Sequence, residues 1–317
     1  MISNGRWMTK NSQAINGWLM LDKPAGITSA KAVSVVKRTL KPEKIGHGGT
    51  LDPMATGLLP LALGEATKTF NYMVVTDKSY EFTVTWGEER DTDDAEGKVT
   101  ASSEVRPIRA QIEAFMPDFM GKIQQTPPDY SAIHQNGQRA YAMARAGQPV
   151  ELAAREVEVF DFRILQLPLQ GGAEGSTSFT LTCGKGTYIR AVARDLGRKL
   201  GCYGYISALR RTRIGKFSVE HAISLADLEA LGHNPAPNGL VLPVESMLDD
   251  IPALEVDSSN FAKLRQGQGV SIFAIPGAKT LAMQASDQPV ALMHDSKVVA
   301  ICRMESGLLK PVRVFNH

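Results

Sequence analysis

Cysteine is scarce in this chain. The 317 residues include 3 cysteines, at positions 183, 202 and 302, and no two of them form a CxxC pair. Neither a disulfide framework nor a cysteine-based zinc site is expected, and the predicted setting is reducing and cytoplasmic. Long apolar runs are also missing, since none approaches the roughly 20 residues of a membrane-spanning helix. Residues 1–16 lack the basic-then-apolar pattern of a signal peptide and are expected to form a flexible leader.

Cofactor-binding motifs are missing too. The chain has no Walker motif, no GxGxxG after a predicted strand, and no His/Asp cluster at metal-ligand spacing. We therefore expect neither a cofactor nor a metal ion. With 43% of the residues hydrophobic, a core of ordinary size is expected, and the length suits one large domain and one small one.

Net charge is nearly absent, but the charges are unevenly distributed. The 35 basic and 33 acidic residues give a net charge of +2, and acidic residues gather between Glu88 and Glu96. Basic residues gather in two runs: a first run of Lys23, Lys31, Lys37, Arg38, Lys41 and Lys44, and a second run of Lys185, Arg190, Arg194, Arg198, Lys199, Arg210, Arg211, Arg213 and Lys216. One such run is ordinarily a solvated face. Two runs on either side of a candidate site favour a polyanionic partner over a neutral small molecule.

The candidate site is the glycine-rich stretch GHGGTLDPMATG at residues 46–57, which contains a single carboxylate. Its glycines permit backbone conformations that other residues avoid and let another molecule approach the main chain closely. Pro53 has a fixed φ and biases Asp52 toward an extended conformation. From these residues alone, Asp52 is either a turn or capping residue, or a nucleophilic or charge-stabilising carboxylate.

Hydrophobic periodicity predicts a mixed α/β (α+β) fold. Strands are expected over residues 17–21, 58–63, 80–86, 157–165 and 178–183, and helices from an N-cap at Ser29 to residue 40, over 107–120 and over 189–200. Residues 125–154 are expected to form an irregular insertion that projects from the core, with a helix near 140–145. Short β-like pieces after Pro243 place a domain boundary near Asp250, which separates residues 17–250 from residues 251–317.

Several motifs resemble, in the right order, those of the TruB family of tRNA pseudouridine synthases. They are LDKPAG at 21–26, HGGTLDPMATG at 47–57, GEATK at 64–68, DKSY at 77–80, KGTYIR at 185–190 and LRRT at 209–212. The resemblance extends from about residue 17 to residue 316. It implies the pseudouridine synthase fold, with a large central sheet flanked by helices and a small β-rich C-terminal domain similar to PUA modules.

The resemblance also assigns roles to residues of the candidate site. Asp52 would be the catalytic residue, and Arg190 would pair with it and keep it ionised. Tyr80 would stack on the target uracil, while Tyr188 and Leu209 would line the base pocket.

Two further residues are matched to supporting roles. Lys23 would support the site structurally or electrostatically, and His47 would fill the space that the flipped base leaves in the RNA loop. The implied substrate is the uridine at position 55 of the tRNA T-stem-loop, flipped out of its stack. RNA backbone contacts would come from the basic runs and the insertion, and would weaken with salt.

The chain departs from the family pattern at His134, Arg90 and Tyr205, where the family commonly has Lys, Thr and His. The insertion is similar to that of stand-alone bacterial members, so we expect a monomer with no obligatory protein partner. Two alternatives stay open: a guide-RNA-dependent pseudouridine synthase subunit, and a tRNA-folding chaperone in which catalysis is secondary.

Overall fold

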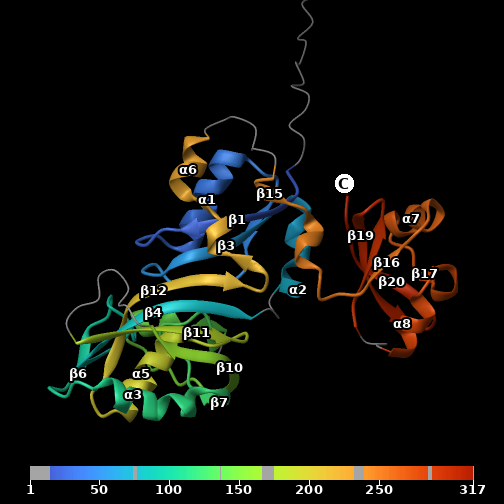
Figure 1. Ribbon diagram of the computed structural model, residues 1–317. Helices are drawn as coiled ribbons and strands as arrows, with labels where there is room; N and C mark the ends of the chain where they lie inside the picture. Colours follow the sequence, from blue (N-terminus) through green and yellow to red (C-terminus); the bar gives the residue numbers. More distant parts are fainter. Residues whose placement is uncertain are drawn as a thin grey trace, which may run out of the picture.

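Two sheets, one large and one small, organise the molecule (Figure 1). The computed structural model describes residues 15–73, 77–135, 137–165, 175–231, 239–284 and 288–316. Within these residues the large sheet has 11 strands, the small sheet has 5, and two further ribbons have two strands each. The expected mixed α/β fold with a β-rich C-terminal part is confirmed.

The large sheet runs in the order β14-β1-β3-β12-β4-β11-β10-β7. These strands are β14 (Ile223–Ser224), β1 (Gly17–Lys23), β3 (Thr56–Leu63), β12 (Gly204–Ile214), β4 (Lys78–Trp86), β11 (Ser176–Cys183), β10 (Arg155–Ile164) and β7 (Gly121–Gln125). Three short strands pair beside this path: β2 (Ile45–His47) on β3, β13 (Phe217–Ser218) on β12, and β15 (Val241–Leu242) on β1. The strands β3, β12 and β4 lie at the centre, although they are far apart in the sequence.

Helices lie near both ends of this sheet. Figure 1 shows α1 (Ser29–Leu40) and α6 (Leu225–Ala230) together near β1, and α3 (Arg109–Phe115) and α5 (Ile189–Lys199) near β10 and β7. The helix expected over 107–120 is split, because after Phe115 the chain tightens into a 3-10 turn at Met116–Phe119 that contains Pro117. The short helix α2 (Phe70–Met73) follows a 3-10 turn at Gly64–Thr69.

The core of the large sheet follows the period-two pattern of its strands. Tyr80, Phe82, Val84 and Trp86 of β4 are all buried, as alternation predicts for one covered face. Phe82 stacks on Phe179 of β11, with ring centroids 5.3 Å apart. These aromatic contacts fasten β4, which carries Tyr80, to its neighbour in the sheet.

The N-cap expected at Ser29 is wrong by one residue. Thr28 caps α1, because its hydroxyl accepts a hydrogen bond from the backbone N–H of Lys31 at 3.1 Å. The hydroxyl of Ser29, inside the helix, exchanges two hydrogen bonds of 2.9 Å with the backbone of Leu51. Ser29 therefore anchors the loop that contains Asp52.

The expected insertion contains a ribbon and a helix. The ribbon pairs β8 (His134–Gln135) with β9 (Gln138–Arg139), and α4 (Ala140–Arg145) follows where a helix was expected. A second ribbon, β5 (Glu88–Arg90) and β6 (Val99–Ser102), carries the acidic turn at residues 91–97. Both ribbons lie outside the two main sheets.

The small sheet is built from residues after Asp250. Its order is β16-β18-β19-β20-β17, with β16 (Ala253–Glu255), β18 (Val290–His294), β19 (Lys297–Glu305), β20 (Leu308–Val314) and β17 (Val270–Ser271). The helices α7 (Ser258–Arg265) and α8 (Ala278–Gln284) accompany it, and 3-10 turns occupy Val219–His221, Val244–Met247 and Ile272–Ala274. The domain boundary expected near Asp250 falls just before β16, and as a division into domains it stays a prediction.

The two sheets share buried apolar side chains. One core cluster combines Trp18 and Met20 of β1 with Val298 and Ile301 of β19 and with Phe315. The contact is also polar, because Lys68 Nζ donates to the carbonyl of Val314 at 2.7 Å. The backbone N–H of Asn316 donates to the Glu65 carboxylate, also at 2.7 Å. The GEATK motif at 64–68 thus holds the end of the chain against the large sheet.

Two expectations concern parts of the chain beyond these elements. Of the predicted leader, residues 1–14 lie outside the described residues, whereas Asn16 accepts a hydrogen bond from the backbone of Glu65 at 2.8 Å. Among the helices of the described residues, none has both the length and the apolar character needed to cross a membrane.

Candidate active site

A cavity of about 810 Å³ opens where the Asp52 loop, the central strands and the start of α5 meet. Its walls include six of the predicted site residues: His47, Asp52, Tyr80, Tyr188, Arg190 and Leu209. Lys23 is the seventh, and the structure places it beneath the loop and not in the cavity wall. The cavity size lies within the range of about 300–1,000 Å³ that is usual for small-molecule sites.

The Asp52 loop is held from three sides. Ser29 fixes the backbone of Leu51, and the buried amine of Lys23 donates to the carbonyl of Pro53 at 3.3 Å and to those of Pro24 and Ile27, each at 2.8 Å. Gly57, at φ +102°, lies against β12 so closely that a Cβ there would sit 2.2 Å from the carbonyl oxygen of Arg211. The close approach that the glycines predicted is therefore made by the protein's own central strand.

Lys23 also lies in the electrostatic field of the site. Burial lowers the pKa of Lys23 to about 8, and the charges of Asp52 and Glu96 oppose this shift. The structure therefore supports the electrostatic part of its expected role and gives it no direct contact with the cavity.

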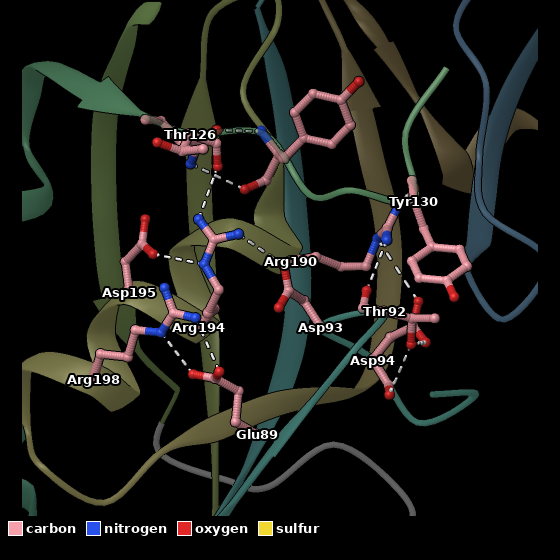
Figure 2. A network of polar contacts seen from close by, with 12 residues as sticks. Glu89, Thr92, Asp93, Asp94, Thr126, Tyr130, Arg190, Arg194, Asp195 and Arg198 are labelled. Carbon is pink, nitrogen blue, oxygen red and sulfur yellow. Dashed lines mark hydrogen bonds and ion pairs between the residues drawn. The ribbon is translucent and has the colours of Figure 1, made fainter. Parts of the chain in front are cut away.

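Arg190 joins Asp52 to two other segments. Its Nε donates to Asp52 Oδ2 at 2.8 Å, while its two terminal nitrogens donate to the carbonyls of Thr92, at 2.8 Å, and Tyr130, at 3.0 Å. Figure 2 shows these backbone contacts of Arg190 beside Asp94, whose carboxylate lies 3.7 Å from Nε. The expected pairing of Arg190 with Asp52 is made through one nitrogen only, because the other two nitrogens bind carbonyls.

The burial of this ion pair is unequal. The side chain of Arg190 is 5% exposed, whereas that of Asp52 is 33% exposed. The guanidinium is thus fixed behind the carboxylate, and the carboxylate itself faces the cavity. An anion in this position can act on a molecule that enters the cavity.

Arg190 is the first of three arginines on one face of α5. Arg194 follows four residues later and pairs with Asp93 at 3.0 Å and Asp195 at 2.8 Å, and its third nitrogen donates to the carbonyl of Thr126. Arg198 forms two bonds to Glu89, at 2.6 and 2.9 Å (Figure 2). This spacing puts all three on neighbouring turns. The helix therefore binds the acidic turn and the first residues of the insertion together.

Asp93 is one of two buried acids in this network, and Asp94 is the other. Burial raises the pKa of Asp93 to about 7, although Arg194, Arg190 and Arg198 favour its ionised form. Its backbone lies in the left-handed region, at φ 60°. The acidic residues between Glu88 and Glu96 are thus partly internal partners of α5.

Tyr80 and Arg211 face the cavity from neighbouring strands. They are register partners in the β4–β12 pair, so their side chains lie on the same face. Burial raises the pKa of Tyr80, and the charge of Arg211 opposes this shift, so the phenol is protonated at neutral pH. Arg211 is 2% exposed and donates to the carbonyls of Leu58, at 2.8 Å, and Gly49, at 3.0 Å. In the sequence, Arg211 belongs to the second run and to the LRRT motif, and neither predicts this contact with the Asp52 loop.

Unpartnered polar atoms gather in the cavity wall. Within the described residues, four buried side-chain nitrogens or oxygens lack a hydrogen-bond partner, and those of His47, Ser131 and Arg155 belong to cavity-lining residues. Burial, with a smaller effect from the charge of Arg211, lowers the pKa of His47, which is therefore neutral at pH 7. Unmade hydrogen bonds are costly when buried, so this wall offers groups to a ligand.

The second basic run is mostly used inside the molecule. Arg210 pairs with Asp22 at 2.7 Å and Arg213 with Asp77 at 2.6 Å, while Lys199 and Lys216 pair with Asp118 and Asp249. Lys185 is the exposed member without an ion pair among the described residues. The expectation that this run forms an RNA-binding surface is wrong for the buried Arg190, Arg194 and Arg211. For Lys185 and for the other members, whose side chains are partly exposed in their ion pairs, it stays a prediction.

Two of the residues that depart from the family pattern contact each other. The guanidinium of Arg90 lies over the ring of Tyr205, 4.1 Å from its centroid, and also bonds Glu88 at 2.8 Å. The third departure, His134, is exposed in the β8–β9 ribbon. No group of three or more His, Cys, Asp or Glu residues that could hold a metal ion occurs in the described part of the chain.

Two family models and several relatives match this chain. The model described as TruB family pseudouridylate synthase (N terminal domain) matches residues 37–189, and the one described as tRNA pseudouridylate synthase B C-terminal domain matches residues 190–249. The tRNA pseudouridine synthase B of Caulobacter vibrioides is 46% identical over 97% of this chain and 98% of its own length. That of Rhodospirillum rubrum is 43% identical with the same coverage.

Solved structures share the fold. The crystal structure of a Cbf5-Nop10-Gar1 complex matches with a TM-score of 0.69 and 25% identity, over 95% of this chain and 84% of that one. The expected pseudouridine synthase fold is thereby confirmed.

Proposed function

This chain belongs to the TruB family of pseudouridylate synthases, and we propose that it converts the uridine at position 55, in the T-loop of tRNA, into pseudouridine. The observation that carries this proposal is the Asp52 carboxylate, 2.8 Å from Arg190 and facing a cavity whose wall includes Tyr80, Tyr188 and Leu209. The curated relatives, which are nearly as long as this chain, bear the name of tRNA pseudouridine synthase B.

The reaction requires one ionised carboxylate and an enclosed site. The bond from ribose C1′ to uracil N1 breaks, and C1′ joins C5 of the same ring. C5 loses a proton and N1 gains one, so atoms and electrons balance without an oxidant, a reductant or water. Asp52 acts either by covalent attack on the ribose or base, or by proton abstraction that forms a glycal. Both routes use the same charged oxygen, which Arg190 stabilises.

The base must leave the RNA stack to reach Asp52. Flipping costs a few kcal/mol, which is offset by stacking and polar contacts in the pocket. In this proposal Tyr80 stacks on the uracil, Tyr188 and Leu209 enclose it, and neutral His47 fills the space left in the RNA loop. The neutral state of His47 suits packing among bases better than pairing with a phosphate.

RNA backbone contacts come from exposed cations of the first run and of the insertion. The first run supplies Lys31, Lys37, Lys41 and Lys44, which are exposed and have no ion pair among the described residues. The insertion supplies Arg139 and Arg145, which line the cavity edge. Contacts of this kind recognise shape and weaken as salt rises.

A second candidate is a guide-RNA-dependent subunit, which the structural likeness to the Cbf5-Nop10-Gar1 complex favours. The higher identity to the bacterial tRNA pseudouridine synthase B proteins favours an enzyme that works as a monomer without a protein partner. One experiment separates the two. The purified protein is incubated with unmodified tRNA alone, and pseudouridine is mapped by carbodiimide modification and counted by tritium release from uracil C5.

We expect one pseudouridine, at position 55, with no guide RNA or other protein present. Turnover only after a guide RNA is added would favour the second candidate, and modification elsewhere would contradict the assigned target. The Asp52→Asn variant should bind tRNA as wild type does and form no pseudouridine. Turnover near wild type in that variant would mean that the catalytic residue is misassigned. Undiminished tRNA refolding by this inactive variant would assign the chain a chaperone role as well.

A further inference from the structure

The insertion leaves and rejoins the large sheet at two residues that face each other. Gln125 is the last residue of β7, Arg155 is the first of β10, and the two are register partners. Gln125 is 2% exposed, although it is polar. A buried amide at this position needs hydrogen-bond partners. They come from a third segment, the loop at residues 184–188 that precedes α5.

Gln125 binds the backbone of Tyr188 at two points. Its side-chain oxygen accepts from the Tyr188 N–H at 2.8 Å, and its amide nitrogen donates to the Tyr188 carbonyl at 3.1 Å. Tyr188 is the N-cap residue of α5, and its side chain makes no capping hydrogen bond. The backbone of this residue is therefore held by a side chain that is 63 positions away in the sequence.

Arg155 holds the same loop from the other side. Its guanidinium donates to the carbonyl of Gly186 at 2.6 Å and lies 5.2 Å from the centroid of the Tyr188 ring. Arg155 and Tyr188 both line the cavity. The two ends of the insertion thus fix both the backbone and the ring of a cavity-wall tyrosine.

The same end of the insertion also reaches the catalytic carboxylate. The carbonyl of Tyr130, five residues after Gln125, accepts from Arg190, whose Nε binds Asp52. Tyr188 and Arg190 are two residues apart at the start of α5. The start of the insertion therefore contacts both Tyr188 in the cavity wall and the arginine of the ion pair.

We propose that Gln125 and Arg155 are positioning residues that hold Tyr188 against the flipped uracil. The two ends of the insertion are then part of the reaction pocket. This inference rests on the proposed function, because it assumes that a base occupies the cavity. Without the two-point bond, Tyr188 must be ordered each time a base enters. Misplacement of a positioning group by about 1 Å can cost about 100-fold in rate.

The test compares Gln125→Met, Gln125→Glu and Arg155→Lys with Lys122→Ala. Lys122 is a matched control, because it lies on the same strand and pairs across β7 and β10 with Glu156, yet is exposed and does not contact the 184–188 loop. Gln125→Glu keeps nearly the same side-chain shape, but it replaces the amide nitrogen that donates to the Tyr188 carbonyl with a carboxylate oxygen. Arg155→Lys keeps the charge and removes the planar group over the ring.

The first readout is hydrogen exchange at residues 186–190 in the free protein, which does not depend on activity. We expect faster exchange of the Tyr188 amide in Gln125→Met, which removes its acceptor, a smaller change in Gln125→Glu, which keeps an acceptor, and no change in Lys122→Ala. Unchanged exchange in both Gln125 variants would overturn the proposal, whatever the substrate is.

The second readout is single-turnover pseudouridine formation on a T-arm RNA. We expect the single-turnover rate constant to fall about 10- to 100-fold in the Gln125 variants and less in Arg155→Lys, while the Kd for RNA stays within about twofold. Weaker RNA binding and lower thermal stability, with an unchanged single-turnover rate constant, would indicate a purely structural role and overturn the proposal. Failure of wild type and Lys122→Ala to modify the RNA would count against the proposed function, and the exchange result would still decide whether Tyr188 is held.

Discussion

The two basic runs of this chain look alike in sequence and differ in the folded protein. Lys31, Lys37, Lys41 and Lys44 of the first run are exposed, and within the described residues none has an acidic partner. In the second run, Arg190 and Arg194 are buried and paired, and most other members bind acids or carbonyls. The first run is available to an RNA backbone, whereas the second organises the site. Counting charges along a sequence cannot separate these uses, because the acidic partners come from distant segments.

Each run also contains exceptions: in the first run Arg38 pairs with Glu229 at 3.0 Å, as members of the second run pair with acids. Lys23 begins the first run but is fully buried under the Asp52 loop, and Lys185 begins the second run but is exposed. The difference between the runs is therefore a matter of position in the fold and not of residue type. The following substitutions test it, in order of decreasing expected effect.

Arg190→Lys should have the largest effect. A lysine has one nitrogen and cannot bind Asp52 and the carbonyls of Thr92 and Tyr130 in the arrangement that arginine makes. Leaving a buried carbonyl without a donor costs about 1–3 kcal/mol. If this cost falls on the transition state, it lowers the rate roughly 10- to 100-fold. Single-turnover kinetics and filter binding would measure it, with Kd for tRNA expected to be unchanged. A rate equal to wild type would remove the ion pair from the mechanism.

Replacing Lys31, Lys37, Lys41 and Lys44 together by glutamine should change the Kd for tRNA and leave the rate unchanged, whereas Arg190→Lys should do the reverse. We expect weaker tRNA binding and a slope of log K against log salt that is smaller by about 0.7–0.9 for each phosphate that is no longer neutralised. The rate at saturating tRNA should stay near wild type. The control removes four exposed charges that already have acidic partners, namely Arg109, Lys122, Arg163 and Lys310. An equal loss in the control would mean that net charge matters and location does not.

Titration of Lys23 should make the activity fall on the alkaline side of the pH–rate profile. Because burial lowers its pKa to about 8, the amine loses its charge as the pH rises through this value, and the Asp52 loop loses a nearby cation. Activity should fall several-fold on the alkaline side, and Lys23→Met should flatten this limb. The effect on stability has the opposite sign. Between about pH 8 and the ordinary lysine pKa of about 10.4, the unfolded chain binds more protons, so this group's contribution to the unfolding free energy rises with pH.

Both effects of Lys23 are open to measurement. Single-turnover rates and chemical denaturation, recorded for wild type and Lys23→Met over the same pH range, would separate them. An alkaline limb that is unchanged in Lys23→Met would assign the titration to another group.

The contact between Arg90 and Tyr205 should give the smallest effect. A partly exposed cation–π pair contributes about 0.5–1 kcal/mol. A double-mutant cycle with Arg90→Thr and Tyr205→His, the residues that the family commonly has there, would measure the coupling by denaturation. We expect positive coupling in stability and little change in turnover. Additive losses would show that the two departures are independent of each other.

The sequence predicted the residues that line the site better than it predicted the contacts that hold them in place. Asp52, Arg190, Tyr80, Tyr188 and Leu209 stand in motifs, and the structure brings all of them to one cavity. The strands of the large sheet were also expected, because alternation along segments such as residues 80–86 is a local signal. These features depend on short stretches of chain.

The support was missed because it uses long-range partners. The carbonyls of Thr92 and Tyr130, which bind Arg190, leave no signature in a sequence, since every residue has a carbonyl. Ser29 looked like a helix cap, and only the fold brings Leu51 within reach of its hydroxyl. Gln125 looked like the start of an irregular segment. Its partner, Tyr188, is far along the chain.

The core that the two sheets share has a practical consequence for handling the protein. Cutting the chain after residue 250 would leave Trp18 and Met20 without the side chains of β19 and Phe315 that cover them, so the shortened product should aggregate when expressed. An affinity tag fused beyond residue 317 would start next to Asn316, whose amide is bound to Glu65.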